Sequence, residues 1–153
     1  MFLLFILLAA FANAEPLCKA YPGSPIWPSL SRWAALNASI SGRLLQPPPP
    51  GAVCHPGQPT YNSASCVTVQ NNWTNIDYHS TNPISSAWSN WNNESCIPYL
   101  PSPCSGEGYP IYVVNATCID DVKKGVDFAR ENHVRLIVKA SGHDYLGRFE
   151  QQS

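Results

Sequence analysis

The stretch Val134-Arg-Leu-Ile-Val-Lys139 runs directly into Ala140-Ser-Gly-His-Asp-Tyr-Leu-Gly-Arg148 near the end of this 153-residue sequence. Its first part is apolar and β-branched, which predicts a buried strand, and Ser141-Gly142 ends that strand. Glycine lets backbone N–H groups approach a ligand closely. The stretch therefore predicts a strand that leads into a tight loop around His143, where an anionic group such as a phosphate would bind.

The residues before this strand have the pattern of a helix and an earlier strand. Residues 111–115 are strand-like, because aromatic and β-branched residues follow Pro110. Thr117-Cys-Ile-Asp120 resembles a capping box, and Asn132-His133 closes the predicted helix. One apolar face is expected at helical spacing: Ile119, Val122, Val126 and Ala129. The succession predicts a βαβ unit with two parallel strands side by side and a right-handed crossover.

The composition changes near Pro110. All 15 prolines lie at or before it, whereas six of the nine basic and six of the ten acidic residues lie after Cys118. The earlier part is rich in Pro, Trp and Cys and is expected to be dominated by loops, with one short helix over residues 28–37. Ser29 or Ser31 would cap this helix, and one face carries Leu30, Trp33 and Leu36.

These patterns predict an α+β protein in four parts. Residues 1–14 are expected to be a signal peptide, residues 15–109 a loop-rich disulfide-bonded region, residues 110–148 the βαβ unit and residues 149–153 a divergent tail. Residues 2–12 are almost continuously apolar and precede Ala12-Asn13-Ala14, which fits a cleavage site. The run is too short to span a bilayer. It lacks the usual early Lys or Arg, so a buried N-terminal strand or helix is the alternative.

The cysteines and sequons also indicate a secreted protein. Six cysteines follow the expected cleavage point, and an even number in an oxidising compartment favours disulfides, with 15 pairings open: Cys18, Cys54, Cys66, Cys96, Cys104 and Cys118. No pair has common zinc-site spacing, so no metal site is predicted. Four sequons predict N-glycosylation, at Asn37, Asn72, Asn93 and Asn115.

The charge balance excludes two classes of partner. The formal net charge is −1 and only 12% of residues are charged, so the sequence carries neither a nucleic-acid footprint nor a polybasic membrane patch. His55, His79 and His133 lack a partner at catalytic or metal-ligand spacing, so structural or surface roles are expected for them. The five tryptophans are expected mainly to pack, although stacking on a ligand is the alternative.

The loop itself is the candidate ligand site. A ligand is expected beyond the carboxyl end of a strand in a βαβ unit, where the N–H groups of residues 141–145 can surround a diphosphate. The sequence is not a Rossmann fingerprint, because no Gly-x-Gly-x-x-Gly lies between strand and helix, and it lacks the Gly-Lys-Ser/Thr ending of a P-loop.

Lys139-Ala-Ser-Gly-His143-Asp-Tyr-Leu-Gly-Arg148 resembles the flavin pyrophosphate loop of the FAD-linked oxidases related to vanillyl-alcohol oxidase and berberine bridge enzyme. The resemblance implies the first lobe of a PCMH-type FAD-binding domain. It also implies covalent attachment of His143 to the 8α carbon of the flavin, for which a neutral imidazole is a suitable nucleophile. The cofactor-binding residues it implies are Ser141, Gly142, His143, Asp144, Tyr145 and Gly147.

The resemblance extends over nearly all of the sequence after residue 14. The segments around Cys18 to Trp33, Gly42-Arg43-Leu44, Cys54-His-Pro and Asn93-Glu-Ser-Cys96 are similar to secreted fungal members of the isoamyl alcohol oxidase-like type. This implies oxidation of an alcohol- or sugar-type small molecule, with oxygen as the acceptor. Such oxidases continue for several hundred residues beyond the loop, so we expect an N-terminal fragment that is inactive alone, with its catalytic base unknown.

A different class of function is also open. Small secreted modules with several disulfides act as binding or effector proteins without a cofactor, and exposed tryptophans would then form the contact surface. Loss of binding when tryptophans are replaced, without any affinity for FAD, would distinguish this hypothesis from the flavin one.

Overall fold

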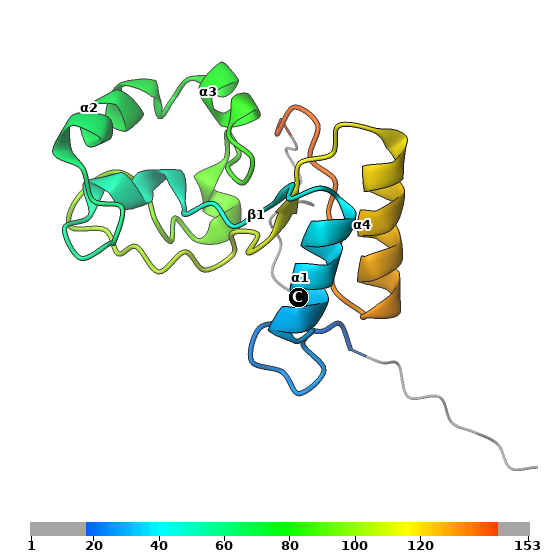
Figure 1. Cartoon of the computed structure of the whole chain (residues 1–153). Coiled ribbons are helices and arrows are strands. Elements are labelled where there is room, and N and C mark those ends of the chain that lie inside the picture. Colours follow the sequence, from blue (N-terminus) through cyan, green and yellow to red (C-terminus); the bar gives the residue numbers. More distant parts are fainter. Residues whose placement is uncertain (1–17, 144–153) are drawn as a thin grey trace, which may run out of the picture.

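The computed structural model describes residues 18–143, and Figure 1 shows their arrangement. One half of the molecule contains the longest helix, α4, beside α1 and a two-stranded sheet; the other half is built from residues 50–109. The elements in chain order are α1 (Leu30–Ser39), β1 (Leu44–Leu45), the 3-10 helix η1 (Pro50–Cys54), α2 (Ser63–Asn72), α3 (Ile76–Thr81), the 3-10 helix η2 (Ser89–Asn92), β2 (Val113–Val114) and α4 (Ile119–Glu131).

Helix α1 forms where the sequence predicts it. Ser29 is its N-cap, and the Ser29 hydroxyl accepts a hydrogen bond from the Arg32 backbone N–H at 3.4 Å. Trp33 and Leu36 are buried as expected. Leu30, which is predicted on the same face, is 80% exposed because it lies in the first turn, ahead of the contact with the core.

The core of this half is aromatic. The Trp33 ring stacks on Tyr112 with ring centroids 4.0 Å apart and lies 4.6 Å from the Phe128 ring, tilted by 45°. Rings bury more apolar area than aliphatic side chains, so this contact contributes strongly to joining α1, α4 and the segment before β2. The buried members are Trp33, Leu36 and Ile40, and the half-buried ones are Trp27, Leu44, Tyr112, Val114, Phe128 and Val134.

The βαβ unit with two parallel strands is not formed by the described residues. β2 pairs with β1 in an antiparallel ladder, with Leu44 opposite Val114 and Leu45 opposite Val113. The expected second strand makes one parallel bridge, from Val134 to Ala20, and residues 135–139 form no ladder within residues 18–143. An apolar, β-branched run favours extended backbone, but a strand also needs a neighbouring strand to accept and donate its hydrogen bonds. That neighbour is not among the described residues.

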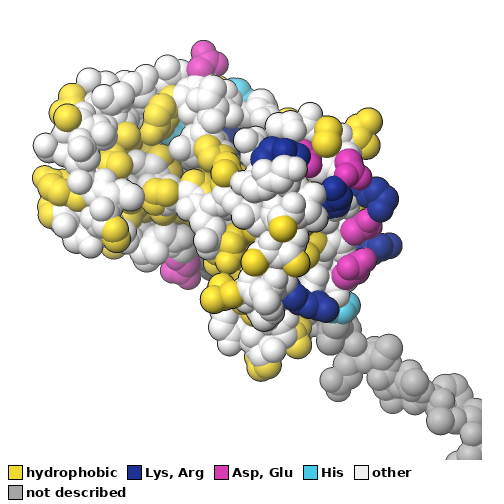
Figure 2. All heavy atoms as spheres, viewed as in Figure 1, with side chains coloured by type: hydrophobic (Ala, Val, Ile, Leu, Met, Phe, Trp, Pro, Cys, Tyr) yellow, Lys and Arg dark blue, Asp and Glu magenta, His cyan; other side chains and the backbone are white. Residues whose placement is uncertain are grey.

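The predicted apolar face of α4 is also wrong. Ile119, Val122 and Val126 are 89%, 52% and 43% exposed, and only Ala129 of the predicted four is buried. The buried side carries Asp121, Gly125 and Ala129 instead. Small residues allow close packing here, since a Cβ at Gly125 would lie 3.4 Å from a Val114 methyl group. Charged side chains of both signs cover much of the α4 surface, as Figure 2 shows.

The start of α4 is held by a partly buried ion pair in place of the expected capping box. Cys118 is the N-cap, but its side chain makes no capping hydrogen bond, and Asp121 at the third helical position accepts from the Thr117 backbone N–H at 2.9 Å. Arg43 reaches Asp121 through two of its nitrogens, at 2.5 and 3.1 Å. The Arg43 hydrogen bonds, with those from Thr117, hold the pKa of Asp121 far below its usual value. The pair ties the start of β1 to the first turn of α4.

The other half contains two helices that the sequence did not predict. Asn62 caps α2 by accepting from the Ser65 N–H, and Asn75 caps α3 by accepting from the Asp77 N–H. Only Val69 is buried in α2, so apolar periodicity was too weak to reveal the helix. A disulfide from Cys54 to Cys66 holds α2 against η1.

The core of that half is small. Its buried members are Ala52, Ile84, Cys96 and Tyr109, with Cys104 and Val113 packed against them. Gly51 lies so close to the chain at Cys96 that a Cβ would approach the Cys96 carbonyl oxygen to 2.1 Å. Only glycine fits this approach. Among residues 18–143, no helix is both long and apolar enough to cross a membrane.

Candidate functional site

The glycine loop lies at the edge of the described chain. Ser141 and His143 are exposed, whereas Gly142 between them is buried. Asp144, Tyr145 and Gly147, the other predicted cofactor-binding residues, lie outside the described residues. The part that is described therefore presents one hydroxyl and one imidazole on either side of a buried turn.

Two features of the structure favour glycine at position 142. Its φ is +73°, in the left-handed region that residues with a Cβ disfavour. A Cβ here would also lie 2.9 Å from Lys139 Cε and 3.6 Å from the Ser85 carbonyl oxygen. The loop thus folds back on Lys139 and rests against residue 85, which is far away in the sequence.

Lys139 connects the base of the loop to the end of α3. Its Nζ donates to the His79 carbonyl oxygen at 2.7 Å, and it also contacts the Asn82 carbonyl oxygen. The last carbonyls of a helix lack partners within the helix, and a cation there is favoured by the helix dipole. The orange and red end of the described ribbon passes beside this part of the molecule in Figure 1.

His79 is buried beneath this contact, with 3% of its surface exposed. Its Nδ1 lies 3.0 Å from the Ser85 hydroxyl and its Nε2 lies 2.7 Å from the Trp73 carbonyl oxygen. Burial lowers the pKa of His79, and the positive charge of Lys139 lowers it further, while the bond to Trp73 acts in the opposite direction. A neutral histidine that joins two segments agrees with the structural role predicted for it.

The residues of the loop have the right chemistry for a phosphate-bearing cofactor. A turn with a left-handed residue is the type of backbone that directs successive N–H groups at an anion. The exposed imidazole of His143 lies next to that turn, so a cofactor held there by its phosphates would have a nucleophile close by. The described donors fit the group that the sequence predicts, namely the diphosphate of FAD.

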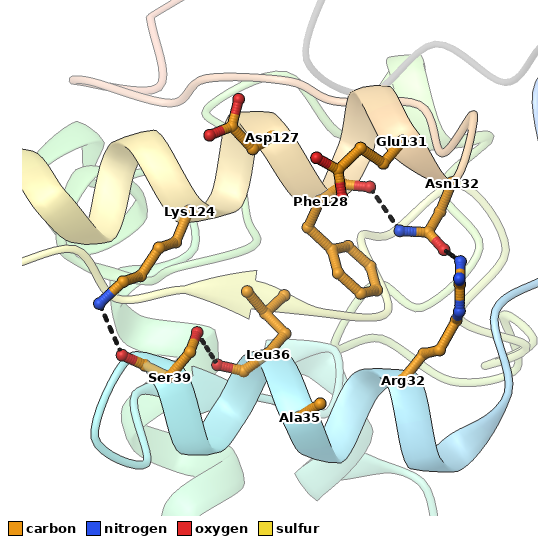
Figure 3. Close-up of a pocket in the computed structure, with 9 residues that line it drawn as sticks. All are labelled: Arg32, Ala35, Leu36, Ser39, Lys124, Asp127, Phe128, Glu131 and Asn132. Carbon is orange, nitrogen blue, oxygen red and sulfur yellow. Dashed lines mark hydrogen bonds between the residues drawn. The ribbon is translucent and has the colours of Figure 1, made fainter.

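A separate groove lies between α1 and α4, with a volume of about 310 Å³. Figure 3 shows Lys124 donating to the Ser39 carbonyl oxygen at one end, at 2.9 Å, and Arg32 paired with Asn132 at the other. Lys124 and the Arg32–Asn132 pair thus join the two helices across the groove. The lining residues are Arg32, Ala35, Leu36, Ser39, Lys124, Asp127, Phe128, Glu131 and Asn132.

His55 lies against a disulfide and has a structural contact of its own. Its ligand atoms and those of Cys96 and Cys104 are all within 4.8 Å of one another, but the two sulfurs are bonded together. A disulfide sulfur is not the thiolate that metals bind. His55 Nε2 lies 2.8 Å from the Ile97 carbonyl oxygen.

Four of the six candidate cysteines are paired, as Cys54–Cys66 and Cys96–Cys104. Cys18 and Cys118 are exposed and unpaired within residues 18–143. Ala20 bonds to His133 beyond the C-terminal end of α4, whereas Cys118 precedes its first residue. The 13 residues of α4 span about 20 Å, so Cys18 and Cys118 lie near opposite ends of this helix and are not placed to bond each other.

The predicted glycosylation sites differ in accessibility. Asn93 and Asn115 are exposed, whereas Asn37 and Asn72 are half-buried. The Asn37 side chain accepts from the Leu44 backbone N–H at 3.0 Å, and the Asn72 amide donates to the Thr68 carbonyl oxygen at 2.8 Å. Modification at all four asparagines stays a prediction.

Comparison with known proteins agrees with the family that the loop sequence resembles. The chain is 38% identical over 148 residues to FAD-linked oxidoreductase ZEB1 of Gibberella zeae. It is also 38% identical over 142 residues to the VAO-type flavoprotein oxidase VAO615 of Thermothelomyces thermophilus. The matches cover 95% and 89% of this chain, respectively. The chain is a homologue of FAD-linked oxidoreductases that include VAO-type flavoproteins.

Solved structures agree with this homology. The VAO-type flavoprotein MtVAO615 from Myceliophthora thermophila matches 86% of the chain with a TM-score of 0.80 and 37% identity. MtVAO713 from the same fungus matches 90% with a TM-score of 0.81 and 30% identity. This FAD-linked oxidoreductase homologue spans about a quarter of the length of the relatives it matches. No protein-family model matches the sequence.

Proposed function

We propose that this chain provides the flavin-binding loop and the first lobe of the FAD-binding domain of an FAD-dependent oxidoreductase. The observation that carries the proposal is a Ser-Gly-His turn with both polar residues exposed, in a chain that matches VAO-type flavoproteins over most of its length. Bound FAD would accept a hydride from the substrate. The chain itself would hold the diphosphate with the N–H groups of residues 141–145.

His143 is the proposed covalent attachment residue. Its exposed imidazole follows the buried Gly142, so it projects from a turn that is itself fixed against Lys139 and Ser85. Its imidazole nitrogen would hold the flavin at the 8α carbon, which would fix the orientation of the ring.

The compartment and substrate class are part of the same proposal. The apolar leader, the sequons and two disulfides support a secreted, glycosylated protein. An alcohol- or sugar-type substrate and oxygen as acceptor are supported by the family resemblance of the loop and by the name oxidase borne by VAO615.

Covalent flavin is the direct test. The chain alone, and a chimera in which residues 18–148 replace the matching quarter of VAO615, are produced in a secreting fungal host and separated by denaturing electrophoresis. We expect flavin fluorescence in the chimera and its loss in His143→Ala, with His133→Ala as a control that keeps it. A chimera that folds and binds no FAD, covalently or otherwise, would refute the flavin function.

The alternative, a cofactor-free binding module that uses exposed tryptophans, is not favoured. Trp33 is buried and the other four tryptophans are half-buried, so none belongs to the exposed residues. Their rings instead pack within the protein, as Trp27 does on Trp33 and Trp73 on His79.

A further inference from the structure

We propose that Lys139 is a positioning residue, which ties the histidine loop to the end of α3 and thereby sets where His143 is presented. The inference rests on the proposed flavin function, because it assigns a purpose to the position of His143. It concerns the segment from His79 to Ser85, called here the α3 seat, which is separated from Lys139 by more than fifty residues in the sequence.

The first argument is the charge on the lysine and where it points. The Lys139 ammonium contacts two backbone carbonyls of the α3 seat, those of His79 and Asn82. Asn82 is the C-cap of α3. Carbonyl groups at a helix end have no partner within the helix. The half-buried Lys139 ammonium provides that partner, and the carbonyls accept its hydrogen bonds.

The second argument is that the loop touches the α3 seat at two points. Lys139 reaches it through its ammonium, and the position of a Cβ on Gly142 lies 3.6 Å from the Ser85 carbonyl oxygen. Three residues span at most about 11 Å when extended. Because both ends of this short segment contact the α3 seat, the backbone position of the next residue, His143, is closely fixed.

The third argument is that the α3 seat is itself rigid. Ser85 is 1% exposed, and the Asn82 side chain accepts from the backbone N–H groups of Ile84 and Ser85, at 3.1 and 3.0 Å. The buried His79 ring contacts the Ser85 hydroxyl through Nδ1 and the Trp73 carbonyl oxygen through Nε2, so it joins these two residues. The lysine therefore anchors the loop to a buried, hydrogen-bonded platform, which a catalytic attachment residue needs for precise placement.

Lys139→Met separates positioning from packing. Methionine keeps most of the aliphatic stem that Gly142 rests on and removes the ammonium. Lys123→Met is the matched control, because Lys123 is an exposed α4 lysine whose ion pair with Asp127 is a surface contact. Lys139→Arg keeps the positive charge and should therefore keep part of the anchoring that Lys139→Met loses.

Amide hydrogen exchange on the full 153-residue chain is the primary readout. We expect Lys139→Met to speed exchange at residues 141–143 by roughly tenfold or more, since the loop opens locally, while α1 and α4 exchange as in the parent. Lys123→Met should leave the loop unchanged. Equal loop exchange in the parent, Lys139→Met and Lys123→Met would overturn the inference.

Should Lys139→Met fail to fold, Gly142→Ala provides the second test. The added Cβ would lie 2.9 Å from Lys139 Cε, so it displaces the lysine side chain from its contacts with the α3 seat, and the φ of +73° strains the turn. Loop exchange should again rise, and an unchanged rate would contradict the two-point seating.

The VAO615 chimera adds a readout at the cofactor. We expect Lys139→Met to slow covalent flavin attachment at least about tenfold and to shift the flavin redox potential, whereas His143→Ala abolishes attachment. Normal attachment and potential in Lys139→Met would show that the seating does not position His143. If no chimera binds flavin, the proposed function fails, and the exchange experiment still decides whether Lys139 holds the loop.

Discussion

Helices α1 and α4 have apolar residues at the same kind of spacing, yet only α1 buries the face that this spacing marks. In α1, Trp33 and Leu36 point into the aromatic core. In α4, Ile119, Val122 and Val126 of the corresponding stripe are exposed, and the neighbouring side with Asp121, Gly125 and Ala129 is buried. Periodicity thus predicted both of these helices, but which side faces a core depends on what is available to cover it.

The two helices differ in their neighbours. The α1 stripe meets Tyr112 and Phe128, both within the described chain. The α4 stripe has no covering element among residues 18–143, and the relatives are about four times longer than this chain. The side of α4 that does pack uses Gly125 and Ala129, whose small size permits close approach to α1 and β2.

Removing Trp33 should produce the largest effect. Trp33→Ala deletes the ring that joins α1 to Tyr112 and Phe128, and a loss of about 3–5 kcal/mol of unfolding free energy is expected, as for other buried aromatic residues. Leu30→Ala on the same helix is the matched control and should change stability by less than about 0.5 kcal/mol, because Leu30 is exposed. Urea unfolding followed by tryptophan fluorescence and circular dichroism measures both. Similar losses in the two variants would mean that the α1 stripe is not a core face.

Acid should lower the stability of the folded protein through Asp121, which lies on the buried side of α4. Because Arg43 lowers the pKa of Asp121 in the folded protein, the unfolded chain binds the proton more readily than the folded one. The stabilisation by this ion pair is present at pH values above 3.8, the ordinary pKa of an Asp side chain, and is lost as the pH falls below that value.

Asp121→Asn should therefore flatten the acid limb of the stability profile and lower stability near pH 7. Thermal melts at several pH values between 2 and 7 measure this. Asp127→Asn is the control, because Asp127 pairs with Lys123 and Arg130 on the outer surface of the helix and should change the profile less. An unchanged acid limb in Asp121→Asn would place the acid sensitivity elsewhere.

The smallest effect should come from the exposed α4 stripe. Val122→Ser and Val126→Ser are expected to change the unfolding free energy of this chain by no more than about 0.5 kcal/mol each, since exposed substitutions rarely do more. In the VAO615 chimera the same changes should cost more than about 1 kcal/mol if the additional length covers the stripe. Equal, small effects in both proteins would show that the stripe stays exposed when the chain is extended.

Several features were predictable because their causes are local. Ser29 before an apolar run predicts the start of α1, and acidic residues early with Arg130 late predict α4. The tight turn was predicted from Gly142, whose φ is +73°. Helices α2 and α3 were missed, because they are stabilised by asparagine caps and by the Cys54–Cys66 disulfide instead of an apolar stripe.

The order of residues was enough to indicate a histidine loop, a flavin family and two helices, since turn chemistry, capping and short motifs act over a few neighbouring residues. The seat of the loop was decided by tertiary structure alone. Nothing near Lys139 in the sequence reveals that its ammonium meets the carbonyls of His79 and Asn82, or that Gly142 rests against Ser85. Pairing between distant segments depends on how the whole chain packs, and it is this packing that selected the buried side of α4 and the antiparallel partner of β2.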